Sequence, residues 1–326
     1  MAGNDSTVTI GFSTHHIEVI PFMRREMEHH DITVLEEPPN QGFAEMLEGN
    51  IAVEDYLLGV DSQFPLFDRA MCMELKHQRR MGKTILQVEP YLEMLIEIHE
   101  LFAAGKTPED ILPMPGLREV YLAEKNATGS LIAFYSASRT EAFPNVVDAV
   151  KRFARADAGR LLLRERLRAQ AISSLATGGP SLFIEAGYIH YPLFIFLRRM
   201  PGNIRQIRVR FLLESAVRRH KGKRRNLGPG DLLTLHYSLH GNIEESLGDL
   251  LAARSLIHVR LIDKEELVAG EEEAPHSLDE ARVNRLVDRL TFNDCARLYQ
   301  ALQSEPALDP WIVVSRDPGF EGWKRD

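Results

Sequence analysis

Short apolar runs alternate with stretches of helical periodicity along most of the chain. The first run, at Val8 and Ile10, breaks at Gly11, and a helical pattern starts near Val19. Further short runs, which predict strands, lie at residues 32–35, 84–88, 181–185 and 206–213. Helical spacing fills the stretches at 43–58, 66–81, 91–104, 117–138 and 144–175. This alternation predicts an α/β fold with a mainly parallel sheet flanked by helices.

The same patterns predict how the chain is divided. We expect residues 1–262 to form one α/β, catalytic-like domain that ends with a strand at 257–262. Because helical segments predominate, we also expect a helical subdomain, inserted around 43–78 or 101–175. Residues 263–276 are polar and predict a linker. Two short helices and a late strand at 311–314 follow, so we expect residues 263–326 to pack on the same domain.

Polar side chains follow four of the predicted strands, at the point where each strand ends. His15 follows the first strand, Glu36 and Glu37 the second, and Glu89 the third. The fourth strand ends with Glu185 and is soon followed by His190. The carboxyl ends of parallel strands meet at one edge of a sheet. We therefore expect these imidazoles and carboxylates to form one site.

Two kinds of chemistry suit such a group, and the residues alone leave both open. Imidazoles and carboxylates could bind a divalent metal that activates water. They could also act without a metal, as a general base on water. Either role needs a neutral imidazole and ionised carboxylates near pH 7.

Each candidate also has a simpler structural explanation. Glu36 and Glu37 could be a solvent-facing strand exit, and His190 could be a hydrogen-bonded core histidine. Glu89 precedes a proline and could only favour a helix N-terminus. His15 could be loop surface. The joint pattern favours a site, because several independent strand exits would otherwise all have to be polar by accident.

Composition and missing motifs narrow the function classes. The chain has 326 residues, a net charge of −8 and only two cysteines. We expect a cytoplasmic protein without a secretory signal or membrane span. No P-loop, GxGxxG or GxSxG motif occurs, so a nucleotide cofactor and a serine hydrolase are disfavoured. The acidic charge also disfavours nucleic acid, although the basic stretch at 218–226 could bind phosphate or RNA. We find no signal for an oligomeric state.

Four motifs together resemble a known superfamily. In order they read GFSTHHIEV, TVLEEP, RERLRAQAI and SLFIEAGYIHY. They are similar to motifs of the superfamily that groups erythromycin esterase, the TraB/pheromone-shutdown proteins, ChaN and Tiki. Gly11, Thr14 and His15 match its Gly-x-x-Thr-His opening, and residues 187–190 match its second motif, Gly-x-x-His. The resemblance covers about forty residues at the N-terminus and about forty around the second motif.

The resemblance implies a hydrolase in which His15, Glu36 and His190 are the working residues. Its members differ over the use of a metal, and some bind haem. An arginine-containing helix precedes the second motif in the superfamily, and residues 164–172 resemble it. That helix could be an exposed charged face, or one of its arginines could turn inward to the carboxylates.

Our first hypothesis is therefore a hydrolase of an ester or peptide bond in a small-molecule or peptide substrate. His15 would activate water, Glu36 (or Glu37) would orient it or share a metal, and His190 would be a second metal ligand or would protonate the leaving group. Arg166 would stabilise developing negative charge. If a divalent metal takes part, its ligands would be His15, Glu36 and His190. The residues expected to contact substrate are Glu37, Glu89, Glu185 and Tyr188. A non-catalytic haem, metal or small-ligand binding protein is the alternative, and an interaction module that uses the basic stretch is a third hypothesis.

Overall fold

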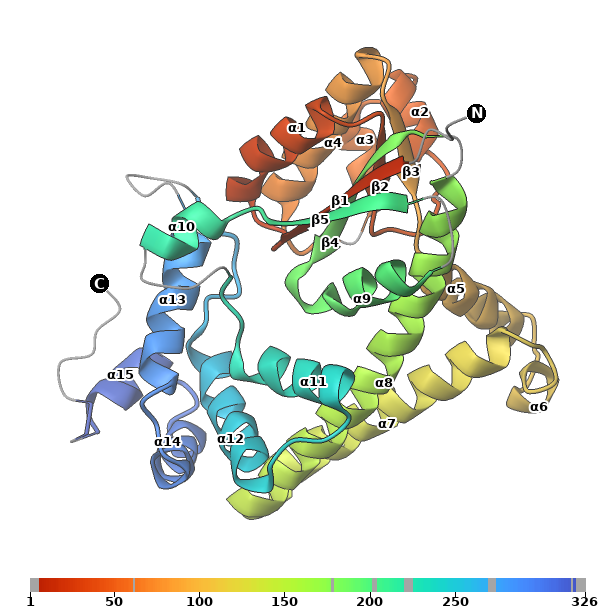
Figure 1. The fold of residues 1–326 in the computed structure, drawn as a ribbon. Coiled ribbons are helices and arrows are strands. Elements are labelled where there is room, and N and C mark those ends of the chain that lie inside the picture. Colours follow the sequence, from red (N-terminus) through yellow and green to blue (C-terminus); the bar gives the residue numbers. More distant parts are fainter. Residues whose placement is uncertain are drawn as a thin grey trace.

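A five-stranded parallel sheet, built from strands between residues 6 and 211, organises one part of the molecule (Figure 1). The computed structural model describes residues 6–60, 62–176, 179–200, 204–219, 225–268, 274–317 and 319–320. The described strands are β1 (Ser6–Ser13), β2 (Ile32–Leu35), β3 (Thr84–Gln87), β4 (Ser181–Gly187) and β5 (Ile204–Phe211). Their order is β3-β2-β4-β1-β5, and all neighbours run parallel. The α/β prediction is confirmed.

The strand register brings the first motif, at residues 11–15, next to the second Gly-x-x-His motif, at residues 187–190. β4 lies between β1 and β2, so its carboxyl end is next to the ends of both. Gly11 of β1 is opposite Glu185 of β4, and Ser13 is opposite Gly187. A Cβ atom at Gly11 would lie 2.5 Å from the ring of Phe183, so glycine permits the close packing here. Segments far apart in the sequence therefore leave the sheet side by side.

One face of the sheet is covered by the helices that precede β3. They are η1 (Ile17–Val19), α1 (Ile20–Glu28), α2 (Phe43–Glu48), α3 (Val53–Leu57) and α4 (Pro65–Arg80). Met23 of α1 and Leu75 of α4 are buried in one cluster with Leu35 and Phe183 of the sheet. Apolar residues at helical spacing thus form the layer that supports this side of the strand ends.

The opposite face is covered by α8 (Phe143–Leu175) and α9 (Pro192–Arg199), and η2 (Tyr188–His190) joins β4 to α9. Ile172 of α8 and Leu193 of α9 are buried against Val8 and Ile10. α8 has 33 residues, which makes it roughly 50 Å long at about 1.5 Å per residue. Only its C-terminal part lies on the sheet (Figure 1).

The rest of α8 packs with other helices, away from the sheet (Figure 1). α5 (Pro90–Ala103), α6 (Pro108–Ile111) and α7 (Leu117–Thr140) form one group with its middle part. Its N-terminal part contacts a second group, drawn from α11 (Pro229–His240), α12 (Glu245–Leu261), α13 (Pro275–Val287), α14 (Phe292–Ser304) and α15 (Pro310–Ser315). α10 (Glu214–Arg219) follows β5 and contacts α13. Within the described ranges, none of these helices is both long enough and apolar enough to cross a bilayer.

Two predicted strands are helical. The stretch at 257–262 is the end of α12, where Ile257 and Leu261 are buried four residues apart and Val259 is exposed. The late strand at 311–314 is α15, because Pro310 occupies its first turn and the Asp309 carboxylate accepts a hydrogen bond from the Trp311 amide. Proline at the first helical position and an aspartate cap start a helix despite the β-branched residues that follow.

Candidate functional site

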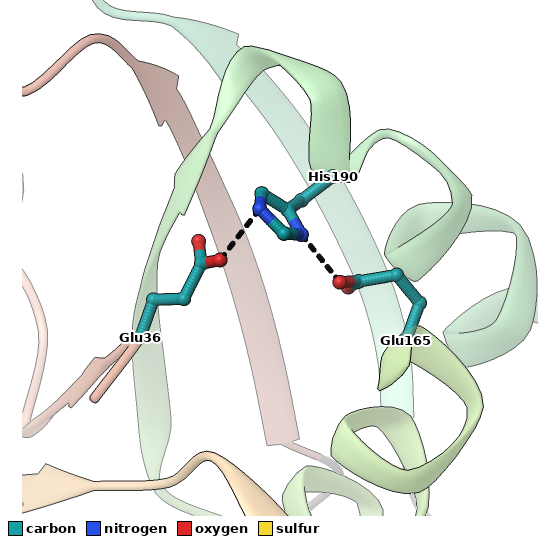
Figure 2. Close-up of side chains that lie close together, drawn as sticks. All are labelled: Glu36, Glu165 and His190. Atoms are coloured by element: carbon teal, nitrogen blue, oxygen red, sulfur yellow. Dashed lines mark hydrogen bonds and ion pairs between the residues drawn. The ribbon is translucent and has the colours of Figure 1, made fainter. Parts of the chain in front are cut away.

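Three side chains from separate segments meet beside the carboxyl edge of the sheet (Figure 2). Glu36 follows β2, His190 ends η2, and Glu165 projects from α8. The Nε2 atom of His190 lies 2.7 Å from a Glu36 oxygen, and its Nδ1 lies 2.5 Å from a Glu165 oxygen. Burial alone would lower the pKa of His190, but the two carboxylates raise it to about 9. The ring is therefore a buried cation at neutral pH.

Two arginines of α8 complete this network. Arg164 and Arg168 each place a guanidinium nitrogen near Glu36, at 3.0 and 3.2 Å. Arg168 is fully buried and also donates a hydrogen bond to the backbone carbonyl of Glu185, at 2.6 Å. Burial opposes ionisation of Glu36, but His190 and the arginines hold the pKa of this carboxyl well below its usual range. Glu36 is thus an ionised, buried carboxylate that joins the end of β2 to His190 of the second motif.

Glu89 joins the network from the third strand end. Its carboxylate is fully buried, and one oxygen lies 3.0 Å from Nε of Arg164. Burial raises the pKa of Glu89, while the two arginines oppose that shift. The prediction that distant strand ends converge is therefore met for Glu36, Glu89 and His190.

His15 lies beside this network, in a more open position. Its Nε2 donates to a Glu185 oxygen at 3.0 Å, and the other Glu185 oxygen accepts a bond from the Glu36 amide at 3.1 Å. The His15 side chain is 46% exposed, whereas that of Glu36 is 5% exposed. Phe67 stacks on the His15 ring with centroids 5.3 Å apart. Of the two histidines, His15 is the one that a substrate can reach.

A cavity of about 400 Å³ lies in front of His15. Its polar lining includes Glu37, Tyr56, Asp68 and Gln87, and apolar side chains from α2 to α4 close the rest. Gln87 donates to the Glu37 carboxylate at 2.9 Å. The volume lies in the range of small-molecule sites. Glu37, predicted from the sequence as a substrate contact, lines this cavity.

The electrostatics of His15 differ from the expectation of a neutral imidazole. Burial would lower the pKa of His15, but the hydrogen bond and charge of Glu185, helped by Glu36 and Glu37, raise it to about 9. His15 is therefore mainly protonated at neutral pH, and it becomes a base only in alkaline solution.

The side chains that lie close enough to share a metal differ from the predicted ligands His15, Glu36 and His190. Donor atoms of Glu36, Glu165 and His190 lie within 4.8 Å of one another, so Glu165 stands where His15 was expected. Each nitrogen of the His190 ring already faces a carboxylate, and Glu36 also faces the guanidinium groups of Arg164 and Arg168. A divalent cation would have to replace a proton of the ring and lie beside two fixed cations. This arrangement does not fit a resident metal.

Two predicted site residues lie elsewhere. The prediction for Arg166 is wrong, because its guanidinium forms an exposed ion pair with Glu119 at 2.6 Å. Adjacent residues of a helix lie about 100° apart, and here the inward face belongs to Glu165 and Arg168. Tyr188 is not part of the network either, since it lines a second cavity together with Thr14 and residues of α12 and α13.

Glu165 was missed as a site residue, although the sequence contains a signal for it. Leu161, Ala169 and Ile172 form a buried stripe of α8, and Glu165 and Arg168 interrupt that stripe. Charged residues at core positions of a helix require buried partners. The basic stretch predicted as an alternative interaction site lies largely outside the described residues, since 220–224 are not described.

Comparison with known proteins identifies a relative that matches most of the chain. A protein of Archaeoglobus fulgidus, described as uncharacterized, is 30% identical over 289 residues, which cover 88% of this chain and 96% of the relative. No protein-family model matches the chain, and no solved structure matches it.

Proposed function

This chain belongs to one family with the Archaeoglobus fulgidus protein, and we propose from the geometry of the site that it hydrolyses an ester or peptide bond. The observation that carries the proposal is that His15, which is hydrogen-bonded to Glu185, lines the cavity. The resemblance of residues 11–15 and 187–190 to the erythromycin esterase and TraB motifs supports the same class of reaction.

In the proposed reaction His15 is the general base. The bond to Glu185 holds the ring by Nε2, and no hydrogen bond to Nδ1 is found within the described residues. Nδ1 of the neutral ring takes a proton from water as the water oxygen attacks the carbonyl carbon. The carbon–oxygen or carbon–nitrogen bond then breaks, and His15 returns the proton to the leaving group. Glu37, in the same cavity, contacts the substrate.

The buried network has a positioning role in this scheme. Arg168 bonds the Glu185 backbone, and the Glu36 amide bonds the Glu185 side chain. His190, which is itself paired with Glu165, in turn holds Glu36. Locked side chains behind a catalytic pair fix its geometry, and small displacements of reacting groups reduce rates strongly. His190 therefore acts through Glu36 and Glu185 and does not contact the substrate.

The proposal is tested by assaying p-nitrophenyl esters and fluorogenic peptides between pH 6 and 9.5. His15→Ala should lower turnover by about 10²–10⁴-fold, the usual contribution of a general base, and circular dichroism should verify that the variant is still folded at the assay temperature. His29→Ala, at an exposed histidine bonded to its own helix, is the matched control. Turnover should rise with pH toward a midpoint near 9. Full activity of His15→Ala would refute the proposed base.

A Glu185→Gln variant separates catalysis by His15 from hydrolysis elsewhere. Glu185 raises the pKa of His15, so its neutral replacement should move the midpoint of the pH profile downward. A midpoint that does not move would contradict the assignment. A cytoplasmic location belongs to the same proposal, because Cys72 and Cys295 are both free thiols, as is usual in a reducing compartment.

A binding protein without turnover is the second candidate function. It is favoured by the burial of Glu36 and His190, which a substrate does not reach directly. Metal analysis of the purified protein and the same substrate screen distinguish the candidates. Turnover that survives chelation supports the metal-free hydrolase, and a bound metal or haem without turnover supports the binding protein.

A further inference from the structure

The segment between α12 and α13 reaches α4, the helix that forms one wall of the His15 cavity. The carboxylate of Glu266 in this segment accepts hydrogen bonds from the backbone amides of Leu66 and Phe67, both at 2.7 Å. These amides lie in the first turn of α4, where the side chain of the N-cap residue, Phe64, provides no hydrogen bond. The first amides of a helix have no acceptor within the helix and form the positive end of its dipole, so a carboxylate stabilises them. Glu266 therefore caps α4, although the two segments are 200 residues apart in the sequence.

The capped turn of α4 contacts both histidines of the GFSTHHIEV motif. Phe67 stacks on the ring of His15 with ring centroids 5.3 Å apart, and Phe64 meets the ring of His16 edge-on at 5.0 Å. Phe64 also lines the cavity in front of His15. Phe67 is buried, and closely packed side chains transmit a displacement to their neighbours. A shift of this turn would therefore move His15 and the cavity wall beside it.

The segment that carries Glu266 is itself bonded to the start of α13. The backbone amide of Leu267 donates to Nε2 of His276 at 2.8 Å. Nδ1 of His276 therefore carries the proton of the ring, and it donates to the buried carboxylate of Glu18 at 2.8 Å. The ring of His276 also stacks on His16, with centroids 3.8 Å apart. The segment, α13 and the loop that carries the two histidines thus form one connected set of contacts.

We infer that Glu266 is a positioning residue of the proposed hydrolase, and this inference rests on the function proposed above. By fixing the first turn of α4, Glu266 keeps Phe67 against the ring of His15 and so keeps that ring on Glu185. Glu266 does not line the cavity, and the described lining residues all lie between His15 and Gln87. The C-terminal part of the chain therefore contributes to the reaction through α4, without contact with the substrate.

Chemical labelling tests this inference without a substrate. Diethyl pyrocarbonate acylates neutral, accessible imidazoles, and peptide mass spectrometry gives the rate at each histidine. Loss of the cap in Glu266→Ala should favour local opening of the first turn, so acylation of His15 at pH 7 should become faster by about threefold or more. The rates at exposed His29 and buried His190 should not change. An unchanged rate at His15 would overturn the inference, and so would equal acceleration at His190, which indicates general unfolding.

Kinetics test the link between Glu266 and turnover. On an ester that wild type hydrolyses, Glu266→Ala should lower kcat by about tenfold or more, since small displacements of reacting groups reduce rates strongly. Glu266→Gln keeps an acceptor oxygen at the same distance from the backbone and should keep most of kcat. Glu265→Ala, at the exposed neighbouring residue, should leave kcat unchanged.

Circular dichroism verifies that each variant is folded at the assay temperature. An unchanged kcat in Glu266→Ala would overturn the inference. A wild type without turnover would defeat the proposed function alone, and the labelling of His15 would then decide whether Glu266 positions the ring.

Discussion

Replacement of His190 by glutamine should remove a pH-dependent part of the stability. In the folded protein the pKa of His190 is raised from 6.5 to about 9 by Glu36 and Glu165. A histidine of this kind stabilises the folded state fully below its unfolded pKa, and the contribution is lost as pH rises through the folded pKa. The interval of loss is therefore about pH 6.5 to 9.

The expected magnitude follows from the pKa shift. At about 1.4 kcal/mol per pKa unit, the rise from 6.5 to about 9 corresponds to roughly 3 kcal/mol. Glutamine keeps a hydrogen-bonding side chain of similar length but has no charge to gain. The free energy of unfolding of His190→Gln should therefore fall furthest below that of wild type near pH 6, and the gap should shrink by about 3 kcal/mol by pH 9.

Urea unfolding, followed by circular dichroism at pH 6, 7, 8 and 9, measures this gap. Other groups titrate in the same interval, among them His15 and Glu280. The compared quantity is therefore the difference between wild type and variant at each pH, in which their contributions cancel. His29→Gln, at the exposed end of α1, should show no such dependence. A gap for His190→Gln that stays constant from pH 6 to 9 would refute the charged, doubly paired histidine.

Three further predictions concern stability. Arg168→Met should lower the free energy of unfolding by about 3–5 kcal/mol, because it leaves buried carboxylates unpaired. Arg166→Met on the same helix should lower it by less than about 1 kcal/mol. Equal losses for the two variants in urea unfolding would contradict the role of Arg168 as the partner of buried carboxylates. Gly11→Ala should lower the free energy of unfolding by about 1–3 kcal/mol, since its Cβ would lie 2.5 Å from a buried aromatic ring. Gly129→Ala, where the helix faces open space, should instead raise the free energy of unfolding by roughly 0.5–1 kcal/mol. Burial and a neighbouring histidine lower the pKa of His16 to about 3, so wild type should lose stability as pH falls below 6.5, and His16→Phe should lose less in an acid titration.

The strand ends show how much of the candidate site the local hydrophobic pattern predicts. Apolar runs that stop at a polar residue located Glu36, Glu89 and Glu185 beside the sheet edge, because a parallel sheet places every carboxyl end on the same side. The pattern was misleading at 257–262 and 311–314, where β-branched and aromatic residues pack among helices. There, burial against neighbouring helices and a capped first turn outweigh strand propensity.

By itself, the order of residues determined the α/β class, the convergence of strand ends and the two histidine motifs, since these depend on local periodicity and on the common direction of parallel strands. Only the tertiary structure decided which partners meet. The crossing of α8 over the sheet brings Glu165 and Arg168 to His190 and Glu36, and it turns Arg166 outward. The packing of the C-terminal helices decides that Tyr188 lines a separate cavity. Contacts of this kind depend on how whole elements pack, and short-range spacing along the chain does not specify that arrangement.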